Sequence, residues 1–289
     1  MSSPLVSVVC LSHNHERFVK QAIDSVLNQR YPNIELVVVD DASSDQTQAA
    51  IREALRDRPD IEFLALPVNL RNCAAFNRGL ALCHGDYIID LAADDVLLPE
   101  RVSLGVAALE GDLRYGVHFG DALVIDEAGV ELGRHSDQFP HASVPQGDIF
   151  QQVLSRYFIN PTTMMIRRSV LDQLGGYDET LAYEDFDFWV RSSRFTWYAY
   201  SPELMVKRRL TRGSMSSRQY RVGSRQMAST YRVCEKALKL CQNDAERAAL
   251  KARLVFEARQ SLRFLHLGLF GKYSRLIHRI NTARAGKGR

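Results

Sequence analysis

The sequence lacks long hydrophobic runs. No segment reaches the roughly eighteen consecutive apolar residues that a membrane-spanning helix needs. The apolar stretch near the N-terminus follows no basic residues and is too short for a signal-peptide core, so it is predicted to be a strand of the fold. The five cysteines are odd in number and include no Cys-x-x-Cys pair, which argues against a disulfide framework or a zinc site. We therefore expect reduced thiols and a cytoplasmic protein.

Two common phosphate-binding motifs are also missing. The sequence has no G-x-G-x-x-G after its first apolar run and no G-x-x-x-x-G-K-[ST] anywhere, so the usual dinucleotide and P-loop sites lose their main support. A diphosphate could instead be bound through a divalent cation such as Mn²⁺ or Mg²⁺, and these hard cations prefer carboxylate oxygens.

Acidic residues are scarce toward the C-terminus. Residues 207–289 carry 21 Lys and Arg against 4 Asp and Glu, whereas residues 1–206 carry 16 against 30. So abrupt a change in charge predicts a second unit with its own role. We expect a first domain over 1–216 and a basic region over 217–289, which contains no proline and is predicted to form two or three helices.

Strand and helix patterns alternate along the first hundred residues. The strand-like runs are 5–11, 34–40, 61–66 and 86–92, and the helical patterns between them are 16–29, 43–57 and 70–83. The strand-like runs are β-branched and almost continuously apolar, as parallel strands covered on both faces are. This order predicts an α/β fold with an open, mostly parallel sheet flanked by helices.

Polar residues follow each of these strand-like runs. They are Ser12-His13-Asn14, Asp40-Asp41, Asn69 to Arg71 and Asp94-Asp95. Ligands of open α/β sheets bind beyond the carboxyl ends of the strands, so these groups are predicted to form one site. Adjacent carboxylates repel each other, and a bound cation would relieve that repulsion. The alternative is that Asp94 and Asp95 cap the helix near Pro99 and lie in solvent.

Five blocks of the sequence resemble the inverting family 2 glycosyltransferases, which have the GT-A (Rossmann-like) fold and use nucleotide sugars. In chain order the blocks are VSVVCLSHN, ELVVVDDASSD, an N-x7-N-x-G pattern at Asn69, Asn77 and Gly79, GDYIIDLAADDVLLPER, and GGYDETLAYEDFDFWVR. The resemblance covers roughly residues 5–216. It implies a nucleotide-binding half over 1–112 and an acceptor half over 113–216.

The resemblance also implies roles for individual residues in donor binding. Asp41 matches the acid that reads the nucleotide base, and Ser12 and His13 match positions that line the base and ribose pocket. Asp94 matches a residue facing the ribose or sugar, and Asp95 matches a ligand of the divalent cation. Asn77 belongs to a donor-binding block, and Arg71, where a glycine is common, is expected to reach phosphate.

Asp185 matches the family's catalytic base, with Glu184 beside it as an accessory acid. An inverting transfer is a single displacement, so a base must take the proton of the acceptor hydroxyl while positive charge stabilises the diphosphate leaving group. The alternative is that Asp185 belongs to a solvated helix N-terminus, where the helix dipole favours acids.

The sequence departs from the family pattern near the cation and the diphosphate. Ala92 stands where many members have the first Asp of the metal motif, so fewer protein oxygens are expected to hold the cation. Thr211 stands where many relatives have a His. Arg209 or Arg212 could contact the diphosphate in its place.

The basic region leaves several partners open. The segment VFEARQSLRFLHLGLFGKYSRLIHRI is amphipathic and basic, with Leu262, Leu265, Leu269, Tyr273, Leu276 and Ile280 near one face. Such a helix is a candidate for the surface of an anionic membrane, on the inner face of the cell membrane. The alternatives are packing on the catalytic domain and formation of a homodimer. Nucleic acid ranks last, because few aromatic residues lie between the basic ones.

The function expected from these observations is transfer of a sugar, most simply from a UDP-sugar, to a glycan or a lipid-linked acceptor in cell-surface polysaccharide synthesis. The alternative is a catalytically inactive module that binds nucleotide sugars and uses the basic helical region as its interaction surface. The presence of Asp41, Asp94, Asp95 and Asp185 favours the enzyme.

Overall fold

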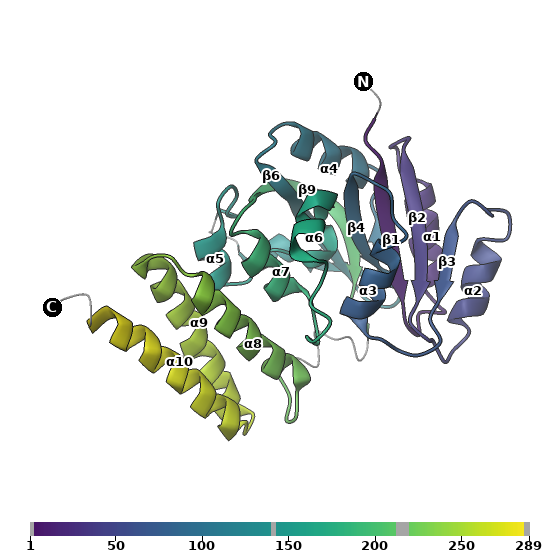
Figure 1. The fold of residues 1–289 in the computed structure, drawn as a ribbon. Coiled ribbons are helices and arrows are strands. Elements are labelled where there is room, and N and C mark those ends of the chain that lie inside the picture. The colour runs from purple at the N-terminus through teal and green to yellow at the C-terminus, as the bar shows by residue number, and fades with distance from the viewer. Residues whose placement is uncertain (1–2, 140–142, 212–219, 286–289) are drawn as a thin grey trace. The chain divides into compact units, whose positions relative to one another are not determined.

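The computed structural model describes residues 3–139, 143–211 and 220–285 (Figure 1). Its contacts divide the chain into two compact units. The sheet unit comprises Met1–Gly147, Ile159–Glu179 and Thr196–Thr211, and the helical unit comprises Asp148–Phe158, Thr180–Phe195 and Arg212–Arg289. The structure thus groups two segments of the expected first domain, 148–158 and 180–195, with the C-terminal helices. The expected boundary at residue 216 lies outside the described residues.

The sheet unit contains a mixed sheet of nine strands in the order β3-β2-β1-β4-β8-β6-β9-β5, with β7 paired to β6. Its strands are β1 (Val6–Ser12), β2 (Ile34–Asp40), β3 (Glu62–Ala65), β4 (Tyr87–Ala92), β5 (Val96–Leu97), β6 (Tyr115–Ile125), β7 (Glu131–Arg134), β8 (Met165–Arg167) and β9 (Trp197–Arg209). The pairs β1–β2, β1–β4 and β2–β3 are parallel. The α/β fold and the first four strands are therefore confirmed.

Helices cover both faces of the parallel strands. Side chains of α1 (Val19–Leu27), α2 (Thr47–Ala54) and α4 (Arg101–Glu110) form one buried core with alternate residues of β1 such as Val8. α3 (Asn72–Leu80) packs on the other face, where a Cβ at Gly79 would lie 2.7 Å from a methyl carbon of Val9. Glycine at that position lets the helix approach the sheet closely.

The second half of the sheet differs more from expectation. The sequence over 114–134 predicts a strand pair with a turn at Glu127 to Gly129, and this pair is present as β6 and β7. A helix is predicted at Ser169 to Leu174, and α6 (Arg168–Leu174) is present there and ends at Gly175, which has a positive φ of 71°. The pattern NPTTMMIRR predicts a strand over 160–168. The observed strand is shorter, because Pro161–Thr163 form a 3-10 turn before β8. The long strand β9, which runs parallel to β6, was not predicted.

The helical unit contains α5 (Phe150–Ser155), α7 (Asp185–Ser192), α8 (Arg225–Leu240), α9 (Asp244–Arg263) and α10 (Leu267–Ala285). Asn243 caps α9, since its side chain accepts a hydrogen bond from the Glu246 amide. The next break lies at 264–266, and Gly268 falls inside α10. Within the described ranges, none of the helices combines the length and the hydropathy that crossing a membrane requires.

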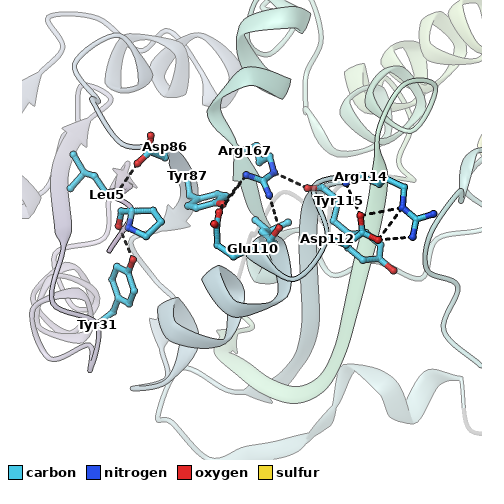
Figure 2. Close-up of polar contacts among 11 residues, drawn as sticks. Leu5, Tyr31, Asp86, Tyr87, Glu110, Asp112, Arg114, Tyr115 and Arg167 are labelled. Carbon is cyan, nitrogen blue, oxygen red and sulfur yellow. Dashed lines mark hydrogen bonds and ion pairs between the residues drawn. The ribbon is translucent and has the colours of Figure 1, made fainter. Parts of the chain in front are cut away.

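Arg167 on β8 joins several elements at the sheet edge where the parallel strands begin (Figure 2). Its guanidinium donates to the hydroxyl of Tyr87 on β4, to the carbonyl of Leu109 near the end of α4, and to the carbonyl of Tyr115 at the start of β6. Tyr87 also bonds to Glu110. All the nitrogens of this arginine therefore have partners.

Arg101, in the first turn of α4, is a contrasting case. Its side chain is fully buried, and none of its three guanidinium nitrogens has a hydrogen-bond partner among the described residues. Burial lowers the pKa of Arg101 to about 9. Burial lowers the pKa of the neighbouring His118 to about 3, and the positive charge of Arg101 adds to this shift. A buried charge without a partner destabilises a fold.

These two arginines give a matched prediction about stability. Arg101→Met should raise the free energy of unfolding, by about 1–4 kcal/mol, because an apolar side chain of similar volume replaces an unpaired buried charge. Arg167→Met should lower it, because three acceptors lose their donor. Urea unfolding of both variants tests the contrast. A destabilised Arg101→Met protein would show that its guanidinium is compensated after all.

Candidate functional site

The predicted convergence of polar groups is present at one edge of the sheet unit. The parallel register places Ser12 opposite Asp40 and Leu11 opposite Ala92. Because β1, β2 and β4 end at this common edge, the residues that follow them come together there. We call this the donor edge and define it by residues 12–15, 40–45, 69–71 and 94–95.

Asp41 organises the loop that follows β3. Its two carboxylate oxygens accept hydrogen bonds from the backbone amides of Leu70, at 2.6 Å, and Arg71, at 2.8 Å. The imidazole Nδ1 of His13 lies 2.8 Å from the carbonyl oxygen of Asp41, and the side-chain amide of Asn69 contacts the same ring. Asp41 is buried, whereas the side chains of His13 and Asn69 beside it are exposed.

The donor edge contains unusual backbone. Four described non-glycine residues have a positive φ, and three of them, Asn14, Ala42 and Arg71, lie here. Arg71 is the most strained of the three, because its φ of 73° and ψ of 168° fall in a region that essentially only glycine visits. This geometry explains in physical terms why a glycine suits the position. The arginine side chain is held exposed at the N-terminus of α3.

Asp94 and Asp95 occupy a tight turn between β4 and β5. Asp95 is buried, and its Oδ1 accepts a 2.8 Å hydrogen bond from the backbone amide of Arg209. Burial, followed by the charge of Asp94, raises the pKa of Asp95 to about 8. Asp94 is partly exposed, with Thr211 Oγ1 3.4 Å from its Oδ2. The alternative that both acids are solvated caps is wrong for Asp95.

The structure corrects the role expected of Arg209. Its guanidinium is buried, and it donates to the carbonyl oxygens of Asp94, Asp126 and Glu127 and to the side chain of Gln21. A guanidinium so engaged holds the carboxylate turn in place and is not directed at a diphosphate. Arg212, the other arginine expected to contact diphosphate, lies outside the described residues.

The residues present fit a divalent cation only in part. A raised pKa means that the ionised form of Asp95 lacks compensating positive charge, which a cation would supply. Among the described residues, however, no group of three or more His, Cys, Asp or Glu side chains is arranged to hold a metal ion. Asp94 and Asp95 could therefore provide carboxylate oxygens, while other ligands would have to come from the donor or from water.

His15 was not predicted as part of the site. Its Nε2 lies 3.9 Å from Asp94 Oδ2, and its buried Nδ1 has no hydrogen-bond partner in the described part of the chain. Burial lowers the pKa of His15, against the opposing effect of Asp94. The sequence signal was available, because His15 belongs to the polar run that follows β1.

Two further residues expected at the donor site have hydrogen-bond partners within the protein. Ser12 is fully buried, and its hydroxyl bonds to the Val39 carbonyl and to Asp40, so it supports the donor edge from behind. Asn77 uses both N–H groups and its oxygen on Tyr177 and Glu179. It therefore joins α3 to the segment after α6.

Asp185 belongs to the helical unit, where it is the first residue of α7 and Glu184 precedes it as the N-cap residue. Asp187, two positions along, is buried between Arg191 Nε and Lys236 Nζ, each 2.6 Å away. The segment leading into α7 is held by α8, since the Ala182 amide donates to Ser229 and Tyr183 bonds to Thr230. The C-terminal helices thus support the helix that carries Asp185.

Comparison with known sequences gives consistent matches. The sequence profile described as "Glycosyl transferase family 2" matches residues 7–175. A Bacillus subtilis protein named as the glycosyltransferase EpsE is 36% identical over 194 residues, which is 66% of this chain and 67% of that protein. An uncharacterised glycosyltransferase of Haemophilus influenzae is 29% identical over 222 residues, covering 74% of this chain and 68% of the relative.

Solved structures with low sequence identity share the fold. TarS 1-349 of S. aureus matches with a TM-score of 0.69 at 16% identity, covering 96% of this chain and 82% of that structure. The mannosyltransferase PcManGT from Pyrobaculum calidifontis, in complex with GDP-Man and Mn²⁺, matches with a TM-score of 0.65 at 18% identity, covering 98% and 76%. Another structure of TarS 1-349 contains UDP-GlcNAc and has a TM-score of 0.66 at 18% identity, covering 90% of this chain and 73% of that structure.

The strain at Arg71 can be tested by substitution. Arg71→Gly should raise the free energy of unfolding, by about 1–3 kcal/mol, because glycine adopts this backbone conformation without strain. The control is Arg78→Gly, since Arg78 lies in the regular helix α3. There glycine should lower stability by about 1 kcal/mol. Urea unfolding distinguishes the two, and equal destabilisation of both variants would contradict the interpretation.

Proposed function

Since this chain belongs to glycosyltransferase family 2 and is a glycosyltransferase, we propose that it transfers a sugar from a nucleoside diphosphate donor with inversion at the anomeric carbon. The observation that carries the proposal is the donor edge. There a buried carboxylate, Asp95, and its neighbour Asp94 are held by Arg209 beside β4, on the same sheet edge as Asp41. This arrangement suits a nucleotide whose phosphates are bound through a cation rather than a glycine-rich loop.

The proposed donor is a nucleotide sugar, most simply a UDP-sugar. TarS has been solved with UDP-GlcNAc and PcManGT with GDP-Man, so both kinds of donor are bound by proteins with this fold. In this chain Asp41 would read the base, His13 would border the base and ribose, and Arg71 would approach phosphate. Each of these assignments rests on the family resemblance and on the position of the residue at the donor edge.

The proposed cofactor is Mn²⁺ or Mg²⁺. The carboxylates of Asp94 and Asp95 would hold it together with oxygens of the donor, since Ala92 provides no third acid. A cation bound there would supply positive charge against the negative charge that develops on the leaving diphosphate. The Mn²⁺ in the PcManGT complex supports this proposal.

The proposed reaction is one displacement with Asp185 as general base. The acceptor hydroxyl oxygen forms a bond to the anomeric carbon while the bond from that carbon to the diphosphate oxygen breaks, and the hydroxyl proton moves to the Asp185 carboxylate. Asp185 lies in the first turn of α7, where the helix dipole stabilises negative charge. Glu184 is the accessory acid.

The proposed acceptor is a hydroxyl of a glycan or lipid-linked glycan, in the synthesis of a cell-surface polysaccharide. We further propose that the protein acts in the cytoplasm, which is consistent with five cysteines that are all buried thiols outside disulfides. A homodimer remains a proposal for its assembly.

Asp95→Asn tests the cation site. We expect UDP or a UDP-sugar to raise the melting temperature of the wild-type protein more with Mn²⁺ than without, because the cation and the donor bind together. Asp95→Asn should lose this dependence on Mn²⁺, while its ligand-free melting temperature stays equal or rises because a repelling buried charge is gone. Asp60→Asn, on the exposed surface away from the donor edge, is the control. Equal stabilisation of the wild type with and without Mn²⁺ would refute the assignment.

Asp185→Asn tests the general base. The variant should keep its affinity for the donor but lose turnover by roughly 10²–10⁴-fold, the usual contribution of a general base. Turnover is measured as nucleoside diphosphate release with acceptor, and donor affinity as the thermal shift. Glu184→Gln serves as the matched neighbour and should lose much less. Turnover within a few-fold of the wild type would place the base elsewhere.

A further inference from the structure

The fourth non-glycine residue with a positive φ lies far along the chain from the donor edge. Leu265 has a φ of 60° in the turn between α9 and α10, where glycine or asparagine is the usual residue. Its side chain is 76% exposed, so burial in the core does not compensate for the strain. Strain of this kind that serves no packing purpose points to a function of the side chain.

Leu265 is one of a group of exposed apolar side chains. We call the tip the surface formed by residues 220–225 and 259–272. It exposes Val222, Leu262, Leu265, Leu267 and Phe270, which are five of the twelve large apolar residues that are exposed in the described part of the chain. An exposed apolar group of this kind marks an interaction surface.

The two segments of the tip form one surface. His266 Nε2 lies 3.1 Å from the amide nitrogen of Gly223 and 2.9 Å from the carbonyl oxygen of Arg221. The ring of Tyr220 stacks on Phe264, with ring centroids 6.2 Å apart. Figure 1 shows the start of α8 and the turn between α9 and α10 at the same end of the helices.

The charged side chains of the tip all have the same sign. Exposed basic residues lie among and beside the apolar ones, and neither segment contains an Asp or Glu. They are Arg221, Arg225, Arg259, Arg263 and Lys272. Apolar side chains that protrude from a basic surface match the two layers of an anionic membrane, its acyl boundary and its negative headgroups.

We propose that the tip docks on an anionic lipid bilayer, with its apolar side chains in the interfacial layer and its basic side chains on the headgroups. A second copy of the chain fits less well, because a two-fold interface at the tip would bring like charges together without acids to pair them. A nucleic acid would leave the apolar side chains without partners. The proposal does not depend on the donor chemistry.

The structure also corrects which part of the basic region could face a membrane. The expected apolar face of the 255–280 segment included Tyr273, Leu276 and Ile280, and these three are buried. They belong to the core of the helical unit, so α10 does not present that face to solvent. The leucines that remain exposed are those near the turn.

The test uses the full chain, because the C-terminal helices are part of one unit with α7. Flotation with vesicles of phosphatidylglycerol and phosphatidylcholine, at low and high salt, is compared with vesicles of phosphatidylcholine alone. The wild type should float with the anionic vesicles at low salt and be released at high salt, since screening weakens the attraction. The double variant Arg263→Gln with Lys272→Gln should bind anionic vesicles more than tenfold more weakly, because each lost charge weakens binding by about fivefold.

Leu265→Asn distinguishes an effect on membrane binding from an effect on the stability of the fold. Asparagine tolerates the left-handed backbone, so the melting temperature should stay equal or rise, while partition to anionic vesicles falls by about tenfold. The control Leu113→Asn removes another leucine, 82% exposed in the sheet unit, and should bind like the wild type. Thermal shifts with donor should be the same in all variants.

Three outcomes would overturn the proposal. The wild type could fail to float at low salt, Leu265→Asn could float as well as the wild type, or the protein could bind phosphatidylcholine equally. Sedimentation of the protein without lipid tests whether a second copy of the chain binds at the tip instead. A dimer that Leu265→Asn abolishes, in a protein that ignores vesicles, would assign the tip to a second copy.

Discussion

The donor edge depends on the buried guanidinium of Arg209. It connects the turn at Asp94 with α1, through Gln21, and with the turn after β6, through the carbonyl of Asp126. These partners are uncharged carbonyl and amide oxygens, so the hydrogen bonds to them do not neutralise the charge of Arg209. That charge lowers the pKa of Asp95, but burial and Asp94 have the larger effect. The turn is thus held firmly while the carboxylate pair still lacks compensating charge.

Local patterns were sufficient to predict the first half of the sheet but not the second. The runs that became β1, β2, β3 and β4 are almost continuously apolar, and parallel pairing with both faces covered is what such runs favour. β9 contains Ser201-Pro202-Glu203 and ends in basic residues, so its local pattern is weak. It is a strand because β6 and β5 pair with it, and such distant pairing cannot be read from a local window.

The same distinction applies to the site. The sequence correctly placed polar residues at the ends of parallel strands, because strand direction alone determines that edge. It could not show that Asn77 and Arg209 are engaged within the protein, since their partners are 82 or more residues away along the chain. The strained backbone of Arg71 was also hidden, although the substitution of an arginine for a common glycine was its visible sign.

The abrupt change in charge along the sequence does not coincide with the units of the structure. α8 supports the approach to α7 through Ser229 and Thr230, and Lys236 pairs with the buried Asp187. The basic helices therefore have a buried side that belongs to the scaffold of Asp185 and an exposed side that carries the tip. Removing residues 217–289 would expose the apolar and charged surfaces of α7. An inactive truncated protein would consequently say nothing about whether the C-terminal helices contact substrate, and only substitutions at exposed positions can separate the two roles.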